Sequence, residues 1–115
     1  MRKVALLMAI VLVISLPLSV SAAPRALSVY PTLSFNGTTA TCEVYVLGNN
    51  NSEHIEVTMK LMRGNYCEAT WYADDYGYVY MLEYDTVTKG YTYDLVVTVT
   101  VNGVAKQPVS VSKTC

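Results

Sequence analysis

Residues 90–103 carry the clearest alternation of apolar and polar positions in the chain. The odd-numbered positions from 91 to 101 are apolar or aromatic, and the even-numbered ones are polar except for Val96. Successive side chains of a strand point to opposite faces, so this period of two predicts a strand with one buried and one solvated face. Asn102-Gly103 follows as a typical hairpin-turn dipeptide. We therefore expect the other segments to form strands that cover this one.

Similar alternation recurs from residue 26 to the end of the chain, interrupted by turn residues. β-Branched and aromatic residues, which favour strands, dominate these segments, and no stretch repeats apolar residues at helical spacing. The pattern predicts an all-β, mainly antiparallel chain of about seven strands packed as two sheets. Pro31 and Pro108 each remove a backbone donor, which places the first and last strands at sheet edges. The expected strands cover residues 26–35, 39–47, 54–63, 66–73, 78–87, 90–103 and 104–115.

Residues 1–22 have the pattern of a signal peptide. Arg2 and Lys3 precede an apolar run that ends at Leu18, and the small residues up to Ala22 offer a cleavage site. The run is shorter than the roughly 20 apolar residues that a bilayer-spanning helix needs. We therefore expect a cleaved signal peptide and a secreted mature chain with no transmembrane segment.

The mature chain, about 93 of the 115 residues, has the size of one domain, which we expect over residues 26–115. Its size and strand count fit an immunoglobulin-like or fibronectin type III-like sandwich better than a closed barrel. Loss of Arg2 and Lys3 leaves six basic residues against nine acidic ones, with no basic run. Nucleic acid and anionic lipid are therefore poor candidates as partners.

Three cysteines, Cys42, Cys67 and Cys115, remain in the mature chain. In an exported protein the default use of cysteine is a disulfide, and three cysteines allow one bridge. Cys42 and Cys115 are both in phase with the inward positions of their strands, so we favour this pair. The third thiol either bridges to another molecule or stays buried and unreactive. No Cys-x-x-Cys motif or histidine pair accompanies the cysteines, so we expect no metal site.

The titratable side chains that a catalytic site needs are nearly absent. The one histidine, His54, lies beside Glu53 and Glu56, and no serine lies in a Gly-x-Ser-x-Gly motif. Asp74-Asp75 offers carboxylates for Ca²⁺, but a dedicated site needs about six to eight oxygen ligands, so a polar loop explains the pair better. We therefore expect no enzyme activity and no cofactor.

Tyrosine is concentrated in one part of the chain. Eight of the ten tyrosines fall between Tyr66 and Tyr93, with the only tryptophan among them. Several are even-numbered and would project to one side of a regular strand. Facing solvent, these rings suit protein contact or stacking against sugars; facing inward, they are core residues. The candidate binding residues are Trp71, Tyr76, Tyr78, Tyr80 and Tyr84.

The segment Gly90-Tyr91-Thr92-Tyr93-Asp94-Leu95 resembles the start of the sixth strand in fibronectin type III and related domains. The resemblance implies that Tyr93 is the corner tyrosine, whose hydroxyl bonds back to the backbone, with Tyr91 as the competing choice. Antibody-type domains have a cysteine two residues after this tyrosine and a tryptophan on the third strand. Here Leu95 takes the first position and Trp71 lies one strand later. Only the sandwich architecture carries over.

The mature chain as a whole also resembles small secreted proteins of Gram-positive bacteria of the clostridial, gut type. That family has no established activity, so the resemblance implies export and a sandwich fold without a mechanism. We expect a non-catalytic binding module for an extracellular protein or cell-surface component; the alternative is a small carbohydrate-binding module that uses the aromatic side chains. The similar segments are residues 40–42, 59–64, 69–71, 87–93 and 112–115.

Overall fold

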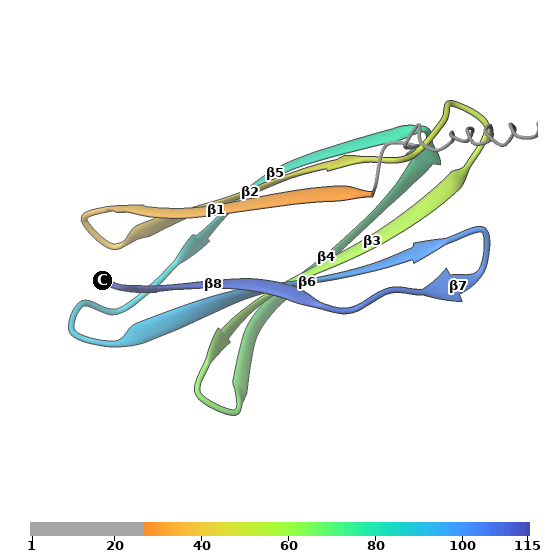
Figure 1. Cartoon of the computed structure of the whole chain (residues 1–115). Coiled ribbons are helices and arrows are strands. Elements are labelled where there is room, and N and C mark those ends of the chain that lie inside the picture. The colour runs from red at the N-terminus through yellow and green to blue at the C-terminus, as the bar shows by residue number, and fades with distance from the viewer. Residues whose placement is uncertain (1–26) are drawn as a thin grey trace, which may run out of the picture.

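The computed structural model describes residues 27–115, which form eight antiparallel strands (Figure 1). The signal peptide expected over residues 1–22 lies outside the described residues. No helix long and apolar enough to cross a membrane occurs among residues 27–115. The strands are β1 (Ser28–Asn36), β2 (Thr39–Leu47), β3 (His54–Arg63), β4 (Tyr66–Tyr76), β5 (Tyr78–Thr86), β6 (Thr92–Val101), β7 (Val104–Ala105) and β8 (Val109–Thr114).

The strands form two packed sheets, as the alternation predicts. The three-stranded sheet has the order β1-β2-β5, and the five-stranded sheet has the order β4-β3-β6-β7, with β8 also paired to β6. In constant-type immunoglobulin domains the fourth strand joins the sheet of the first strand. Here β4 pairs with β3 instead, so the fourth strand lies in the opposite sheet. Figure 1 shows the two sheets as separate layers.

The core lies between the sheets and takes every second side chain of the long strands. β2 contributes its even-numbered positions and β3 and β6 their odd-numbered ones, so burial follows the period of two along each strand. The described part of the chain has no fully buried polar or charged side chain. The largest side chains in this core are Tyr93, Ile55, Met59, Leu61 and Leu95.

The strand with the clearest sequence signal is an interior strand. β6 pairs with β3 along one side and with β8 and β7 along the other. β1, which contains Pro31, and β8, which follows Pro108, are at sheet edges as predicted. The alternation in residues 90–103 therefore marks the strand that organises the larger sheet.

Two predicted assignments are wrong, whereas the ends of the other strands differ from the prediction by at most two residues. The last strand is not continuous from residue 104 to 115 but divides into β7 and β8, because Pro108 has no amide to donate and the pairing with β6 shifts by one residue between Ala105 and Val109. Asp74-Asp75, expected in a loop, belongs to β4, where it pairs with residues of β3. The turn falls instead at Gly77, whose φ of 78° is in the region that favours glycine.

The expected disulfide between Cys42 and Cys115 is not formed, and all three cysteines are free thiols. Both residues do lie on the inward side, but they lie at different levels of the sandwich. Cys42 is within β2 opposite Leu33, whereas the sulfur of Cys115 donates to the carbonyl oxygen of Gly37, in the turn between β1 and β2, at 3.5 Å. Two residues can both point into the core and still lie too far apart along the strands to form a disulfide.

Tyr93 has the geometry expected of a corner tyrosine. Its side chain is 1% exposed, and its ring lies 5.8 Å from that of Phe35. The amide of Thr88 donates to its hydroxyl at 2.9 Å, and the hydroxyl donates to the carbonyl oxygen of Thr88 at 3.4 Å. Tyr91 is exposed and instead lies against Arg63, at 4.6 Å from the guanidinium carbon to the ring centroid. The Tyr93 hydroxyl therefore ties the β5–β6 connection to the core.

We predict that Leu61→Ala lowers the free energy of unfolding by about 2–5 kcal/mol, because this fully buried side chain would leave a cavity between the sheets. The matched control is Val104→Ala, whose side chain is exposed and whose loss should change stability by less than about 0.5 kcal/mol. Urea denaturation followed by tryptophan fluorescence measures both. Equal effects of the two substitutions would contradict the placement of the core.

We predict that Tyr93→Phe costs about 1–3 kcal/mol, since the Thr88 amide loses its partner in a part-buried position. Tyr91→Phe removes the same hydroxyl from an exposed ring and should be close to neutral, within about 0.5 kcal/mol. The same denaturation experiment compares the two variants. A Tyr91 variant that is the less stable of the pair would reverse the assignment of the corner.

Candidate binding face

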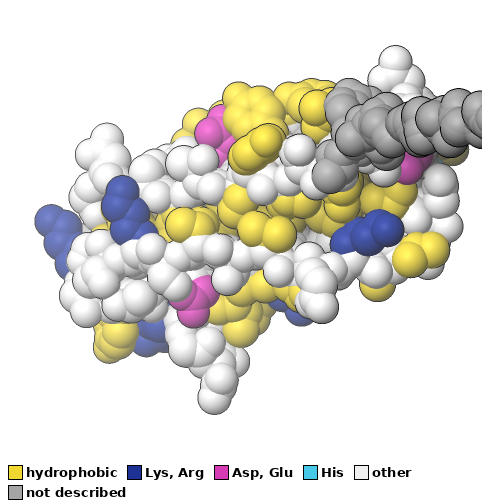
Figure 2. Space-filling model, in the orientation of Figure 1, with side chains coloured by type: hydrophobic (Ala, Val, Ile, Leu, Met, Phe, Trp, Pro, Cys, Tyr) yellow, Lys and Arg dark blue, Asp and Glu magenta, His cyan; other side chains and the backbone are white. Residues whose placement is uncertain are grey.

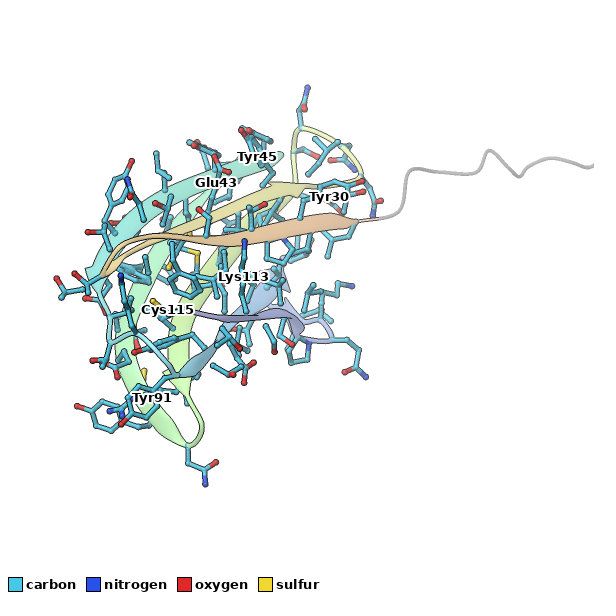
Figure 3. All side chains as sticks on the ribbon, turned by 90° about the vertical axis from the view of Figure 1, so that its left-hand side faces the viewer. Tyr30, Glu43, Tyr45, Tyr91, Lys113 and Cys115 are labelled. Atoms are coloured by element: carbon cyan, nitrogen blue, oxygen red, sulfur yellow. The ribbon has the colours of Figure 1, made fainter. Side chains whose placement is uncertain are left out.

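Large aromatic side chains cover the outer surface of the three-stranded sheet, which we call the tyrosine face. Because β1, β2 and β5 each send one row of residues into the core, the other row points to solvent. Figure 3 shows Glu43 and Tyr45 projecting from β2 away from the five-stranded sheet. The large side chains of the tyrosine face are Tyr30, Glu43, Tyr45, Leu47, Tyr78, Tyr80, Leu82 and Tyr84.

The centre of the tyrosine face is a row of three tyrosines, one from each strand. Tyr30 of β1 is directly opposite Tyr45 of β2, and Tyr45 is directly opposite Tyr80 of β5. The rings of Tyr45 and Tyr80 are 4.7 Å apart between centroids, and Tyr45 also lies 6.3 Å from Tyr78. Cross-strand register therefore joins residues that are up to 50 positions apart in sequence, from 30 to 80, into one continuous cluster.

The tyrosine rings of this face remain accessible, including Tyr45 and Tyr80, which contact each other. Tyr30 is 62% exposed and Tyr84 60%, and Tyr45 and Tyr80 are each 42% exposed. Leu47 and Leu82 add exposed aliphatic surface between them. Figure 2 shows hydrophobic side chains along the upper rim of the molecule with acidic ones beside them. A contiguous exposed apolar surface of this kind marks an interaction site in soluble proteins.

One carboxylate stands within this surface. The Tyr80 hydroxyl donates to Oε2 of Glu43 at 2.6 Å. This hydrogen bond, with a smaller contribution from partial desolvation, raises the pKa of Tyr80 above its ordinary range. The phenol therefore keeps its proton and donates a hydrogen bond to the Glu43 carboxylate. The two ion pairs in the described part of the chain are His54–Asp74 and Arg63–Glu68, so Glu43 is not paired with a basic side chain.

The charge of the three-stranded sheet is of one sign. β1, β2 and β5 contain the carboxylates Glu43, Glu83 and Asp85 and no lysine, arginine or histidine. Glu83 and Asp85 occupy half-buried positions of the core-facing row on the edge strand β5. Inward-pointing charges on an edge strand disfavour edge-to-edge pairing with another sheet. Figure 3 places Lys113 on β8, beside β1 and away from the side where Glu43 and Tyr45 project.

The outer surface of the five-stranded sheet also exposes tyrosines, Tyr72 and Tyr76, but differs from the tyrosine face in carrying an acid–base pair. His54 Nε2 lies 2.7 Å from Asp74 Oδ2, and the Tyr72 hydroxyl donates to Glu56 Oε2 at 3.2 Å. Lys60 is exposed on the same strand and in phase with Glu56. On this surface Asp74 thus has a basic neighbour, His54, whereas Glu43 on the tyrosine face has none.

The structure brings together three of the five predicted binding residues. Tyr78, Tyr80 and Tyr84 share the tyrosine face, because Val79 and Met81 between them are buried. The other two, Trp71 and Tyr76, belong to β4 in the opposite sheet. Trp71 packs against the core opposite Met59 and is only half-exposed. Tyr76 is exposed but stacks on His54, with centroids 5.0 Å apart.

The sequence analysis did not identify Tyr30, Glu43 and Tyr45 as part of the site. Each occupies an outward position of its own alternating strand, so the outward phase was available as a signal. What was missing is the pairing of β2 with β5, which are separated by two intervening strands. Alternation identifies the face of a strand but not its neighbour.

The residues considered for catalysis and metal binding do not converge. His54 and Asp74 form a solvent-exposed pair, and Glu53 Oε1 accepts from the amide of Asn49 at 2.7 Å. Asp75 lies next to Asp74 on β4, and adjacent residues of a strand point to opposite faces. Residues 27–115 contain no cluster of three or more histidine, cysteine or acidic side chains that could hold a metal ion, and they enclose no pocket. A ligand of residues 27–115 would therefore have to bind on the outer surface of a sheet.

The thiols differ sharply in environment. Burial, assisted by the nearby charges of Asp85 and Glu83, raises the pKa of the Cys42 thiol from 9.0 to about 12. Cys67 is exposed on the edge strand β4, where its sulfur is 3.2 Å from the Thr70 hydroxyl. The thiolate is the reactive form of cysteine, so Cys42 is inert in the folded domain.

The sequence as a whole matches no known protein family and no curated protein.

We predict that iodoacetamide alkylates Cys67 in the folded protein at mildly alkaline pH, while Cys42 reacts only after unfolding. The raised pKa keeps Cys42 protonated, and the sheets cover its sulfur. Peptide mapping by mass spectrometry, with and without denaturant, measures both sites. Native-state alkylation of Cys42 as fast as that of Cys67 would contradict its burial.

Proposed function

We propose that this chain is a secreted bacterial, non-catalytic β-sandwich that binds an extracellular protein or cell-surface component through the tyrosine face. The observation that supports the proposal is the cluster of five exposed tyrosines and two exposed leucines on the outer side of the three-stranded sheet. Tyrosine offers a large, rigid contact area with a polar tip, which makes it a frequent anchor of protein interfaces. The signal-peptide pattern of residues 1–22 supports action outside the cytoplasm.

The alternative, a carbohydrate-binding module, has less support. Trp71, its strongest candidate, lies on the other sheet and half within the core. On the tyrosine face the rings of Tyr45 and Tyr80 are tilted by 41°, and those of Tyr45 and Tyr78 by 43°. Tilted rings do not offer the common plane on which a run of sugar rings would stack. They do suit a protein surface, whose side chains enter from several directions.

We predict that Tyr45→Ala combined with Tyr80→Ala lowers the affinity of the mature domain for cells of the producing organism by at least about tenfold, the range of interface hot spots. Tyr72→Ala is the matched control, since Tyr72 is an exposed strand tyrosine that also bonds a glutamate but lies on the opposite sheet. Flow cytometry with fluorescently labelled protein measures the binding. Circular dichroism verifies that each variant is folded.

Binding that the double variant retains and Tyr72→Ala abolishes would move the site to the other sheet and overturn the proposal. A glycan array with the wild-type domain addresses the alternative. Saturable binding to a defined polysaccharide that depends on Tyr45 and Tyr80 would assign the tyrosine face to carbohydrate instead of protein.

A further inference from the structure

Away from the tyrosine face, the described part of the chain holds the side chain of its own Arg63 between two tyrosines and a glutamate. The guanidinium carbon of Arg63 lies 4.6 Å from the ring centroid of Tyr91 and 5.4 Å from that of Tyr66. Its Nε donates to Glu68 Oε2 at 2.8 Å. Two tyrosine rings and one glutamate thus hold one guanidinium by cation–π attraction and a charge-assisted hydrogen bond.

The tyrosine face also contains two tyrosines and a glutamate close together, but no arginine lies among them. Glu43 lies on the central strand, where Tyr80 donates to one of its oxygens, and the Tyr45 ring lies 4.7 Å from that of Tyr80. The three strands of this sheet carry no basic residue. The carboxylate therefore lies next to exposed tyrosine rings, which can attract a cation, and its charge has no counterpart on its own sheet.

From this arrangement we propose that the partner bound by the tyrosine face is a polypeptide that presents an arginine side chain to Glu43, on the solvent side of the Tyr45 and Tyr80 rings. The inference rests on the proposed function and names the chemistry of its partner. Arginine is favoured over lysine because its planar guanidinium is weakly hydrated, stacks on aromatic rings and can bond a carboxylate with two parallel donors.

The same charge argues against a second copy of this chain as the occupant. A two-fold symmetric dimer presents the same patch from both subunits. Pairing two tyrosine faces would place two carboxylates, each without a cation, in one dry interface, and desolvating unpaired charges is costly. A partner with a complementary positive charge removes this cost.

The test uses a short peptide that alternates glycine and arginine, with a citrulline peptide as its neutral, nearly isosteric control. Chemical-shift changes in the ¹⁵N-labelled mature domain report where each peptide binds and how tightly. We expect saturable shifts in β2 and β5 with the arginine peptide, and affinity at least about tenfold weaker with citrulline, about 1.4 kcal/mol. Equal binding of the two peptides, or shifts confined to the five-stranded sheet, would overturn the inference.

Glu43→Gln is the decisive variant, because it removes the charge and keeps the shape and the acceptor for Tyr80. We expect it to weaken the arginine peptide about tenfold, in keeping with loss of a charge-assisted pair. Glu56→Gln is the matched control, since Glu56 also accepts from a tyrosine, Tyr72, but on the other sheet. Unchanged affinity in Glu43→Gln, with the fold intact by circular dichroism, would contradict the inference.

The two proposals fail separately. If the double tyrosine variant loses cell binding and Glu43→Gln does not, the face is a binding site and its partner is not recognised through arginine. If the labelled domain shows concentration-dependent shifts on the tyrosine face without peptide, and light scattering gives twice the monomer mass, the occupant is a second copy. Loss of binding in both the double tyrosine variant and Glu43→Gln supports both proposals.

Discussion

The burial of one side-chain row from every long strand between two sheets is the constraint on which the rest of this structure depends. With no fully buried polar side chain among residues 27–115, the interior is held by apolar contact alone. Hydrogen bonds of the sheets satisfy the backbone, and the Tyr93 hydroxyl satisfies the Thr88 backbone at the β5–β6 connection. No disulfide among the described residues reinforces this packing, so the domain depends on how well the two layers fit.

The same constraint determines what the molecule can show to its surroundings. Once a strand buries one row, its other row must face solvent, and a one-residue slip would exchange the two. The outer faces of the two sheets differ in the side chains they carry. Both sheets expose tyrosine, but the five-stranded sheet pairs Asp74 with His54, whereas the three-stranded sheet adds two exposed leucines and a carboxylate, Glu43, that has no basic partner. This asymmetry directs the functional proposal to one face.

Much of the fold could be predicted from the sequence because the period of two is a local property. Strands β2 and β3 have the boundaries expected from alternation, and Val79 and Met81 resolve the uncertain phase of β5. Errors arose where a long-range partner decided the outcome. Asp74-Asp75 is in a strand because β3 offers a partner, and Cys42 and Cys115 share a side of the sheet but not a level.

The binding face shows the same limit more clearly. Its β5 tyrosines were visible as a cluster in sequence, but Tyr30 and Tyr45 join them only through the order β1-β2-β5, which local patterns do not encode. Glu43 matters only because Tyr45 and Tyr80 lie beside it, since an outward glutamate on a strand is otherwise an ordinary surface residue. Trp71 lies apart from this face for a related reason: it pairs with Met59 in the other sheet and packs against the core.

Hydroxyl-radical footprinting of the folded mature domain tests the central claim most directly, because it reads the exposure of each tyrosine separately. The structure predicts rapid oxidation of Tyr30, Tyr45, Tyr80 and Tyr84 and protection of Tyr93. Protection of Tyr45 and Tyr80 equal to that of Tyr93 in the monomer would show that this row faces the interior, and would contradict both the strand phase and the binding face built on it.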